Sequence, residues 1–247
     1  MHLFDAHFHI IDPRFPLVPN QGFIPEPFSV EDYLDSCYDL QLIGGTVVSG
    51  SFQAFHQEYL YDALDKLGES FFGVANIPHD LPEKQIQRLD LAGVKAVRFN
   101  LKRGGYEMVK HMQSLSKMLF EDFGWHAELY LDSKDISELA PVLNKLPAYS
   151  IDHLGLSHAG LNELYYLVQN GARVKATGFG RLDFNPIPVM KKIMGINPEA
   201  LMFGTDMPST RARVPFSMDD VELVKQHFSF SDQERIFYTN ALQWYRG

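Results

Sequence analysis

The chain has 247 residues and a formal net charge of −9, with 45% hydrophobic and 21% charged residues. This size and composition are typical of one globular domain, and the acidic balance argues against a general nucleic-acid or anionic-membrane surface. No apolar run approaches the roughly 20 residues of a membrane-spanning helix, and no signal peptide is evident, so we expect a cytoplasmic protein. Cys37 is the only cysteine and is predicted to be a small buried side chain on the first helix.

Helical patterns recur along the chain between short apolar runs. The first begins after Ser29, which can form a capping pair with Asp32. A later pattern covers residues 161–170 and ends at a glycine, a common helix stop. Near the end of the chain, Ser231 and Glu234 predict a second capping box before a closing helix.

Eight apolar runs are predicted to be strands. They cover residues 2–9, 45–49, 71–77, 95–100, 127–131, 150–154, 173–177 and 201–205. Strands that alternate with helices in this way favour a closed parallel (β/α)8 TIM barrel over an open doubly wound sheet. No Gly-x-Gly-x-x-Gly motif follows any of them, which weakens a nucleotide-binding alternative. Since no linker divides the chain, we expect a single α/β domain over residues 1–247.

The first strand carries the most informative motif, Asp5-Ala6-His7-Phe8-His9. Alternate residues of a strand share a face, so His7 and His9 should project side by side. Two imidazoles at a strand end can bind a metal ion or polarise a substrate carbonyl, although an isolated pair also arises by coincidence. His126 opens the fifth strand at its amino end and is not expected to take part.

Polar side chains also follow other strands, and in such barrels the active site forms at the carboxyl ends of the strands. His153 follows the sixth strand and Asp206 the eighth, while Tyr130 follows the fifth. Taken alone, His153 could be a satisfied core histidine and Asp206 a turn cap. Together with His7 and His9 they form a convergent set, which predicts an active site.

Cationic side chains gather after several strands of this acidic chain. Guanidinium groups suit carboxylates, so a cationic mouth would attract a small anionic carbonyl substrate. The side chains expected to bind this substrate are Arg98, Asn100, Arg103 and Arg181. Arg211 and Arg213 follow the eighth strand, and we expect them to form salt bridges at the rim instead.

Five motifs spread over the chain carry a family resemblance. They are Asp5-Ala6-His7-Phe8-His9, Val97-Arg98-Phe99-Asn100, Ile151-Asp152-His153-Leu154-Gly155, Phe203-Gly204-Thr205-Asp206-Met207-Pro208 and Asn240-Ala241-Leu242. Their types and order resemble the amidohydrolase superfamily, in its amidohydrolase-2 branch. Within that branch the chain is similar to 2-pyrone-4,6-dicarboxylate lactonases and related sugar lactonases. The motifs behind this finer similarity are Arg98-Phe99-Asn100 with Lys102-Arg103, Trp125-His126 before Tyr130, and Gly178 before Arg181.

The resemblance implies a hydrolase that opens a lactone carrying a carboxylate. Asp206 is then the general base on the attacking water, and Tyr130 can donate a hydrogen bond to the substrate. His7, His9 and His153 are expected to polarise the carbonyl and stabilise the oxyanion.

Asn100 and Tyr130 stand where binuclear members of the superfamily carry metal ligands, so the similarity to the lactonases implies that no cofactor is required. The alternative is one divalent zinc or manganese ion. Its ligands would be His7, His9, His153 and Asp206.

Other functions stay open at this point. A metal-dependent amidase or esterase, or a non-oxidative decarboxylase, could use the same residues. A non-catalytic barrel that binds small acids is a further alternative. Leu156 stands where the lactonases carry a cationic residue, so the substrate either lacks one carboxylate or holds it elsewhere. The identity of the substrate and the oligomeric state are left undecided by the sequence.

Overall fold

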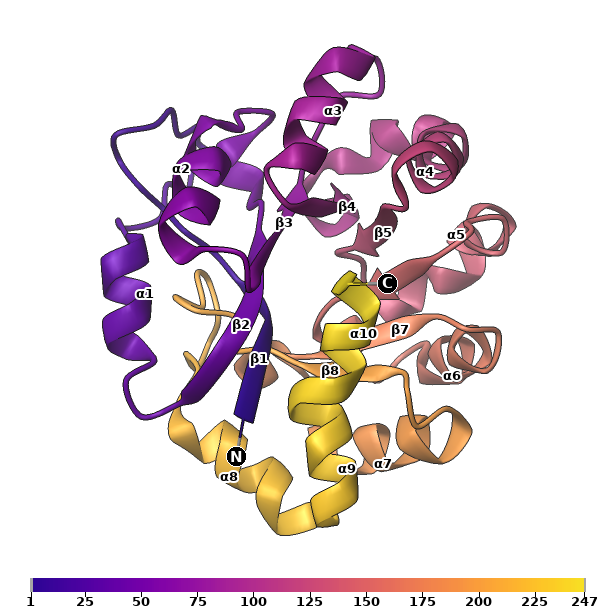
Figure 1. Ribbon diagram of the computed structural model, residues 1–247. Helices are drawn as coiled ribbons and strands as arrows, with labels where there is room; N and C mark the ends of the chain where they lie inside the picture. Colours follow the sequence, from indigo (N-terminus) through magenta and orange to yellow (C-terminus); the bar gives the residue numbers. More distant parts are fainter. Residues whose placement is uncertain (1, 247) are drawn as a thin grey trace.

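The computed structural model describes residues 2–246, and eight parallel strands form one sheet in sequential order (Figure 1). The strands are β1 (His2–Phe8), β2 (Gln41–Val48), β3 (Phe71–Ala75), β4 (Val94–Phe99), β5 (His126–Leu129), β6 (Tyr149–Ile151), β7 (Arg173–Ala176) and β8 (Leu201–Phe203). Each coincides with a predicted apolar run, although β2 begins four residues earlier than expected. The predicted (β/α)8 barrel is therefore confirmed.

The chain segments after β8 lie directly against β1 and bring the barrel to closure at its carboxyl end. The Asp206 amide donates to the His7 carbonyl at 2.7 Å. The buried Asp5 carboxylate accepts the Thr205 amide at 2.8 Å and its hydroxyl at 2.6 Å. Because these bonds join the two ends of the sheet, they hold His7 and Asp206 side by side.

Helices surround the sheet and cover its apolar outer face. They are α1 (Val30–Ser36), α2 (Glu58–Leu67), α3 (Glu83–Leu91), α4 (Val109–Phe123), α5 (Ile136–Leu143), α6 (Leu161–Gln169), α7 (Pro186–Ile196), α8 (Met218–His227), α9 (Phe230–Glu234) and α10 (Asn240–Arg246). Cys37 is buried at the end of α1, as expected. None of the helices within residues 2–246 is long and apolar enough to cross a membrane.

One of the two predicted helix caps is correct. The Ser29 hydroxyl accepts the Asp32 amide at 3.1 Å, and the reciprocal bond completes a capping box. The second prediction, at Ser231, is wrong, because the cap is Ser229, whose hydroxyl accepts the Asp232 amide at 3.2 Å. Both serines precede an acidic residue by three positions, and it is Ser229 that has the extended backbone of an N-cap.

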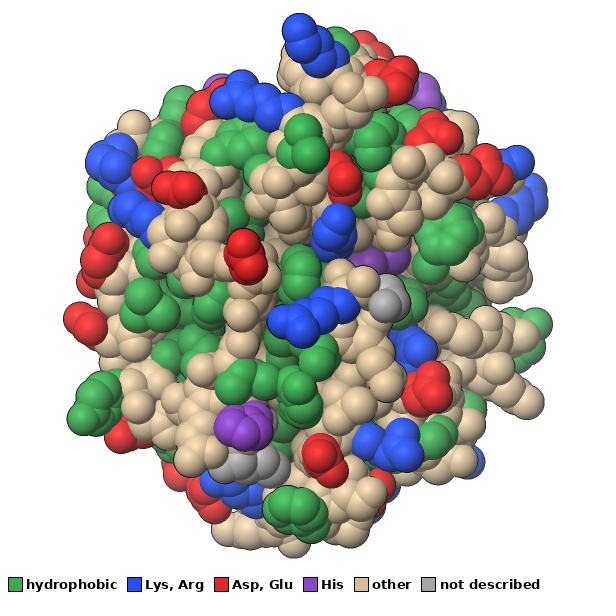
Figure 2. Space-filling view, in the orientation of Figure 1, with side chains coloured by type: hydrophobic (Ala, Val, Ile, Leu, Met, Phe, Trp, Pro, Cys, Tyr) green, Lys and Arg blue, Asp and Glu red, His purple; other side chains and the backbone are tan. Residues whose placement is uncertain are grey.

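Helix α10 lies across the amino-terminal end of the barrel, in front of the strands in Figure 1. Its Tyr245 ring stacks on Phe4 and Phe72 at centroid distances of 5.8 and 6.0 Å, and its hydroxyl donates to Glu128 inside the barrel. Acidic, basic and apolar side chains are interspersed over this face of the molecule (Figure 2). The opposite, carboxyl end is the end at which His7 and Asp206 lie.

Candidate active site

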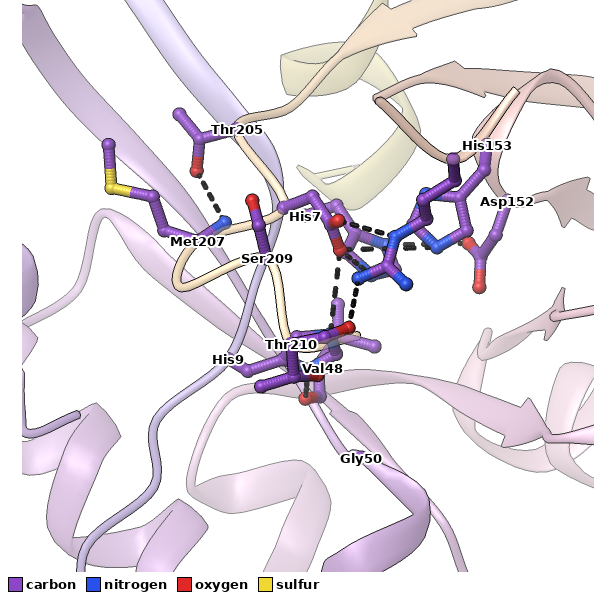
Figure 3. Close-up of polar contacts among 12 residues, drawn as sticks. His7, His9, Val48, Gly50, Asp152, His153, Thr205, Met207, Ser209 and Thr210 are labelled. Carbon is purple, nitrogen blue, oxygen red and sulfur yellow. Dashed lines mark hydrogen bonds and ion pairs between the residues drawn. The ribbon is translucent and has the colours of Figure 1, made fainter. Parts of the chain in front are cut away.

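The imidazoles of His7, His9 and His153 lie together at the carboxyl end of the barrel (Figure 3). The Asp206 carboxylate contacts all three. The Oδ1 atom of Asp206 lies 3.9 Å from His7 Nε2, 3.8 Å from His9 Nε2 and 4.0 Å from His153 Nε2. All four side chains are buried. The structure thus brings together the four residues that the sequence singled out, around a gap that suits one water molecule or one ion.

His9 has one defined tautomer. Its Nδ1 lies 2.7 Å from the Val48 carbonyl, which can only accept, so Nδ1 carries the proton. The lone pair of Nε2 therefore faces Asp206. Burial and the nearby charge of Arg98 lower the pKa of His9 to about 3, which keeps its ring neutral.

His7 Nδ1 lies between two groups of opposite charge. It is 3.5 Å from the Lys175 ammonium, in hydrogen-bond geometry, and 3.4 Å from the Asp152 carboxylate. The ammonium can only donate to Nδ1 and the carboxylate can only accept from it, so the two contacts favour opposite tautomers of His7. Within the described part of the chain, His7 Nε2 has no hydrogen-bond partner. Burial, followed by the charge of Lys175, holds the pKa of His7 well below its usual range.

Lys175 is itself neutralised below the site. Its Nζ lies 2.5 Å from Glu128 Oε2, and both side chains are fully buried. Burial acts to raise the pKa of Glu128, but the charges of Lys175 and His126 overcome it and lower the pKa to about 2. His126 lies at the amino end of β5, 3.3 Å from Glu128 and away from the site, as expected.

Asp206 is held by a single strong ion pair. Arg181 Nε donates to its Oδ2 at 2.6 Å, whereas Oδ1 has no hydrogen-bond partner among residues 2–246. Burial raises the pKa of Asp206, and Arg181 opposes that shift. The bond to Oδ2 therefore fixes the orientation of the carboxylate, and Oδ1 is the oxygen that can accept a proton.

Gly178 makes the close approach of these groups possible. An added Cβ at this position would lie 2.8 Å from His153 Nδ1 and 3.0 Å from Asp206 Oδ2, and the residue has a left-handed φ of +61°. A side chain here would push the two groups apart. Gly178 belongs to one of the motifs named in the sequence, and the structure gives a reason for a glycine at this position.

A small pocket opens above the site. Tyr130 and His153 line it together with all four predicted substrate-binding residues, which are Arg98, Asn100, Arg103 and Arg181. The expectation that Arg211 forms a rim salt bridge is wrong. It lines the pocket and bonds to Asn20, with no carboxylate within ion-pair distance in residues 2–246.

Three site residues went unassigned in the sequence analysis, and all are charged side chains inside the barrel. Asp152 ion-pairs with Arg98 at 3.0 Å and lies beside His7, while Lys175 and Glu128 form the pair below it. A signal for the last two exists, because each is a charged residue with an apolar neighbour on both sides within a strand. Such residues are rarely buried unless they are paired.

The site also has the atoms of a possible metal site. His7, His9 and Asp206 offer ligand atoms that lie within 4.8 Å of one another, and His7 with Asp152 and His153 forms a second such group. The buried Asp206 Oδ1 and His7 Nε2 have no hydrogen-bond partners among the described residues, and two imidazoles with one carboxylate suit zinc or manganese. By donor type and spacing, these residues fit one divalent ion.

Comparisons with known proteins agree with this fold. A protein from Comamonas testosteroni named 2-pyrone-4,6-dicarboxylate hydrolase is 26% identical over 160 residues, which is 61% of this chain and 51% of that protein. This chain thus matches about half the length of that relative. The solved structure of a "probable 2-pyrone-4,6-dicarboxylic acid hydrolase" from Acinetobacter baumannii, with citric acid bound, has a TM-score of 0.81 at 19% identity over 99% of each chain.

A second solved structure, of an Agrobacterium tumefaciens protein, has a TM-score of 0.85 at 18% identity and covers 99% of this chain and 95% of that one. At these identities the two structures support the fold. The sequence profile of the amidohydrolase family matches residues 4–247, nearly the whole chain. The chain therefore belongs to the amidohydrolase family.

Proposed function

We propose that this protein hydrolyses a lactone that carries a carboxylate, with Asp206 activating the attacking water. The observation that carries the proposal is the free Asp206 Oδ1, buried among three imidazoles beneath an arginine-lined pocket. The name of the Comamonas relative, a hydrolase of a pyrone dicarboxylate, supports the same substrate class.

The first step is addition of water to the lactone carbonyl. A water in the central gap can donate one proton to Asp206 Oδ1 and another to the lone pair of His9 Nε2, which orients its oxygen. As the oxygen attacks the carbonyl carbon, Asp206 takes the proton. His9 is thereby proposed to position the water, a finer role than the carbonyl polarisation expected from the sequence.

The second step is collapse of the tetrahedral intermediate. We infer that His7 Nδ1 accepts from Lys175, so that the proton on His7 Nε2 stabilises the developing oxyanion, with His153 and Tyr130 as further donors. The ester C–O bond then breaks, and protonated Asp206 returns its proton to the leaving alkoxide. Water is consumed and one hydroxyl is formed, and the carboxylic acid formed with it ionises to a carboxylate and releases one proton.

We propose that no metal is required. Lys175 directs the His7 proton toward the central gap, where a metal ion would need a lone pair, and Arg181 already neutralises Asp206. A divalent ion held by His7, His9 and Asp206 would supply Lewis-acid polarisation of the carbonyl. The spacing of those three residues is what favours the second candidate, a metal-dependent amidase, esterase or decarboxylase.

We further infer that residues 1–247 act as one domain, that the protein is cytoplasmic and that its partners are small anionic substrates rather than nucleic acid. The continuous eight-stranded sheet supports a single domain. The net charge of −9 and the cationic pocket support small anionic substrates rather than nucleic acid.

A lactone panel with and without a strong chelator tests the proposal. We expect acid release, followed with a pH indicator, from carboxylated lactones at the same rate after chelation. Activity that chelation abolishes and zinc restores would instead favour the metal-dependent amidase or esterase. Release of carbon dioxide would identify a decarboxylase. Tight binding of carboxylates without turnover of any lactone would indicate a binding barrel.

A further inference from the structure

Two of the arginines around the pocket are already paired with buried carboxylates. Arg98 lies 3.0 Å from Asp152 and donates to a backbone carbonyl, and Arg181 lies 2.6 Å from Asp206 and donates to another. The buried carboxylate neutralises most of the charge of the guanidinium group with which it is paired. These two arginines therefore act first in organising the site.

Arg103 and Arg211 are in a different situation. Both line the pocket, and neither has a carboxylate within 4.0 Å in the described residues, as it would in an ion pair. They lie close enough that, after burial, the charge of Arg103 is the largest influence lowering the pKa of Arg211. Two like charges thus lie near each other at the pocket mouth, and neither is in an ion pair with a carboxylate of residues 2–246.

A small hairpin holds this pair in place. The Asn20 side chain donates to the Arg103 carbonyl at 3.1 Å, and its amide oxygen accepts from Arg211 Nη1 at 3.3 Å. The Arg211 guanidinium also stacks over the Phe23 ring, 4.4 Å from its centroid. Asn20 and Phe23 pair through two backbone hydrogen bonds of 3.0 and 3.1 Å, so one turn orients the Arg211 side chain and holds the backbone of the loop that carries Arg103.

The outer hollow that Arg103 and Arg211 also line contains more cations than free carboxylates. Lys102 there is neutralised by Asp132 at 2.7 Å. Asp183 also lines the hollow, where its Oδ1 accepts the His158 amide at 2.6 Å, and it forms no ion pair with either arginine. Positive charge therefore remains in excess around the two arginines, where a planar carboxylate can accept from both guanidinium groups.

We propose that Arg103 and Arg211 form the clamp for the substrate carboxylate, and that Arg211 is the residue that makes the enzyme select an anionic lactone over a neutral one. The inference rests on the lactone hydrolysis proposed above and deepens it. It assigns substrate selection to the loop after β8 and to the hairpin at Asn20–Phe23, which reach the pocket from separate parts of the chain.

The test compares Arg211→Gln with Arg213→Gln, a matched loss of one charge two residues further along the same loop. Arg213 is exposed and lines the outer hollow without reaching the inner pocket. For a lactone carrying a carboxylate, we expect Arg211→Gln to raise KM by about ten- to one-hundredfold with little change in kcat, the usual effect of losing a charge-assisted hydrogen bond. For γ-butyrolactone, a neutral ring, we expect both variants to match the wild type. Arg211→Lys should recover part of the loss.

Equal KM values for Arg211→Gln and Arg213→Gln on the carboxylated lactone would overturn the proposal. An equal rise in the KM of Arg211→Gln for the neutral lactone would also overturn it, because that result indicates a damaged pocket rather than a lost carboxylate clamp. If the wild-type protein hydrolyses no lactone, the function proposed above fails, and the clamp is then judged by calorimetric binding of glutarate. Weaker glutarate binding by Arg211→Gln than by Arg213→Gln supports the clamp, and equal binding contradicts it.

Discussion

Replacing the buried lysine below the site should separate its structural role from its role in positioning His7. Lys175 and Glu128 are fully buried and 2.5 Å apart. Lys175→Met leaves the Glu128 carboxylate with only His126 at 3.3 Å and the Tyr245 hydroxyl. Breaking one side of a buried ion pair costs about 3–5 kcal/mol, and we expect a loss of this size in the free energy of unfolding.

The double variant Lys175→Met/Glu128→Gln removes both charges and should recover most of that stability. It should not recover kcat, because the donor to His7 Nδ1 is still missing. Asp152, 3.4 Å from Nδ1, then accepts the ring proton, and Nε2 loses the proton that it offers to the oxyanion. Loss of one oxyanion donor lowers kcat by about 10²–10³-fold.

Urea unfolding and steady-state kinetics on the same three proteins make the comparison. Lys225→Met is a control, since Lys225 pairs with Glu222 at 2.7 Å on the surface, and we expect no measurable change. If kcat returned together with stability in the double variant, Lys175 would act through folding alone. A Lys175→Met single variant as stable as the wild type would refute the buried-pair argument itself.

Two further predictions concern pH and the glycine at the site. The pKa of Glu128 is lowered from 4.5 to about 2. Its contribution to the free energy of unfolding is therefore full above pH 4.5 and is lost as the pH falls toward 2. Over that range the urea midpoint should fall more for the wild type than for Lys175→Met/Glu128→Gln. Gly178→Ala places a Cβ 2.8 Å from His153 Nδ1 and 3.0 Å from Asp206 Oδ2, at a residue with a φ of +61°. Because this displaces reacting groups, we expect kcat to fall by at least about tenfold. An unchanged kcat for this variant would contradict the tight packing of the centre.

The barrel and the centre of the site were predictable because they depend on short-range patterns. A strand places alternate residues on one face, so the spacing of His7 and His9 already determined that they point the same way. The barrel topology then brings the ends of β1, β6 and β8 to one opening, which is enough to add His153 and Asp206.

The remaining features depend on contacts between distant segments. Arg211 reaches the pocket because a turn at Asn20–Phe23 orients it, and no local pattern around either segment indicates that contact. His7 Nδ1 contacts Lys175, 168 residues away in the chain. The helix cap was assigned to Ser231 instead of Ser229 because both serines offer the same capping chemistry and lie two residues apart.

Turnover by Asp206→Asn on a carboxylated lactone is the most direct measurement of the central chemistry. The amide keeps the shape of the carboxylate but cannot take a proton from water, so kcat should fall by about 10²–10⁴-fold. Because Arg181 loses its counter-charge at 2.6 Å, glutarate should bind this variant at least as tightly as the wild type. A kcat for Asp206→Asn equal to that of the wild type would contradict the role of Asp206 as the general base.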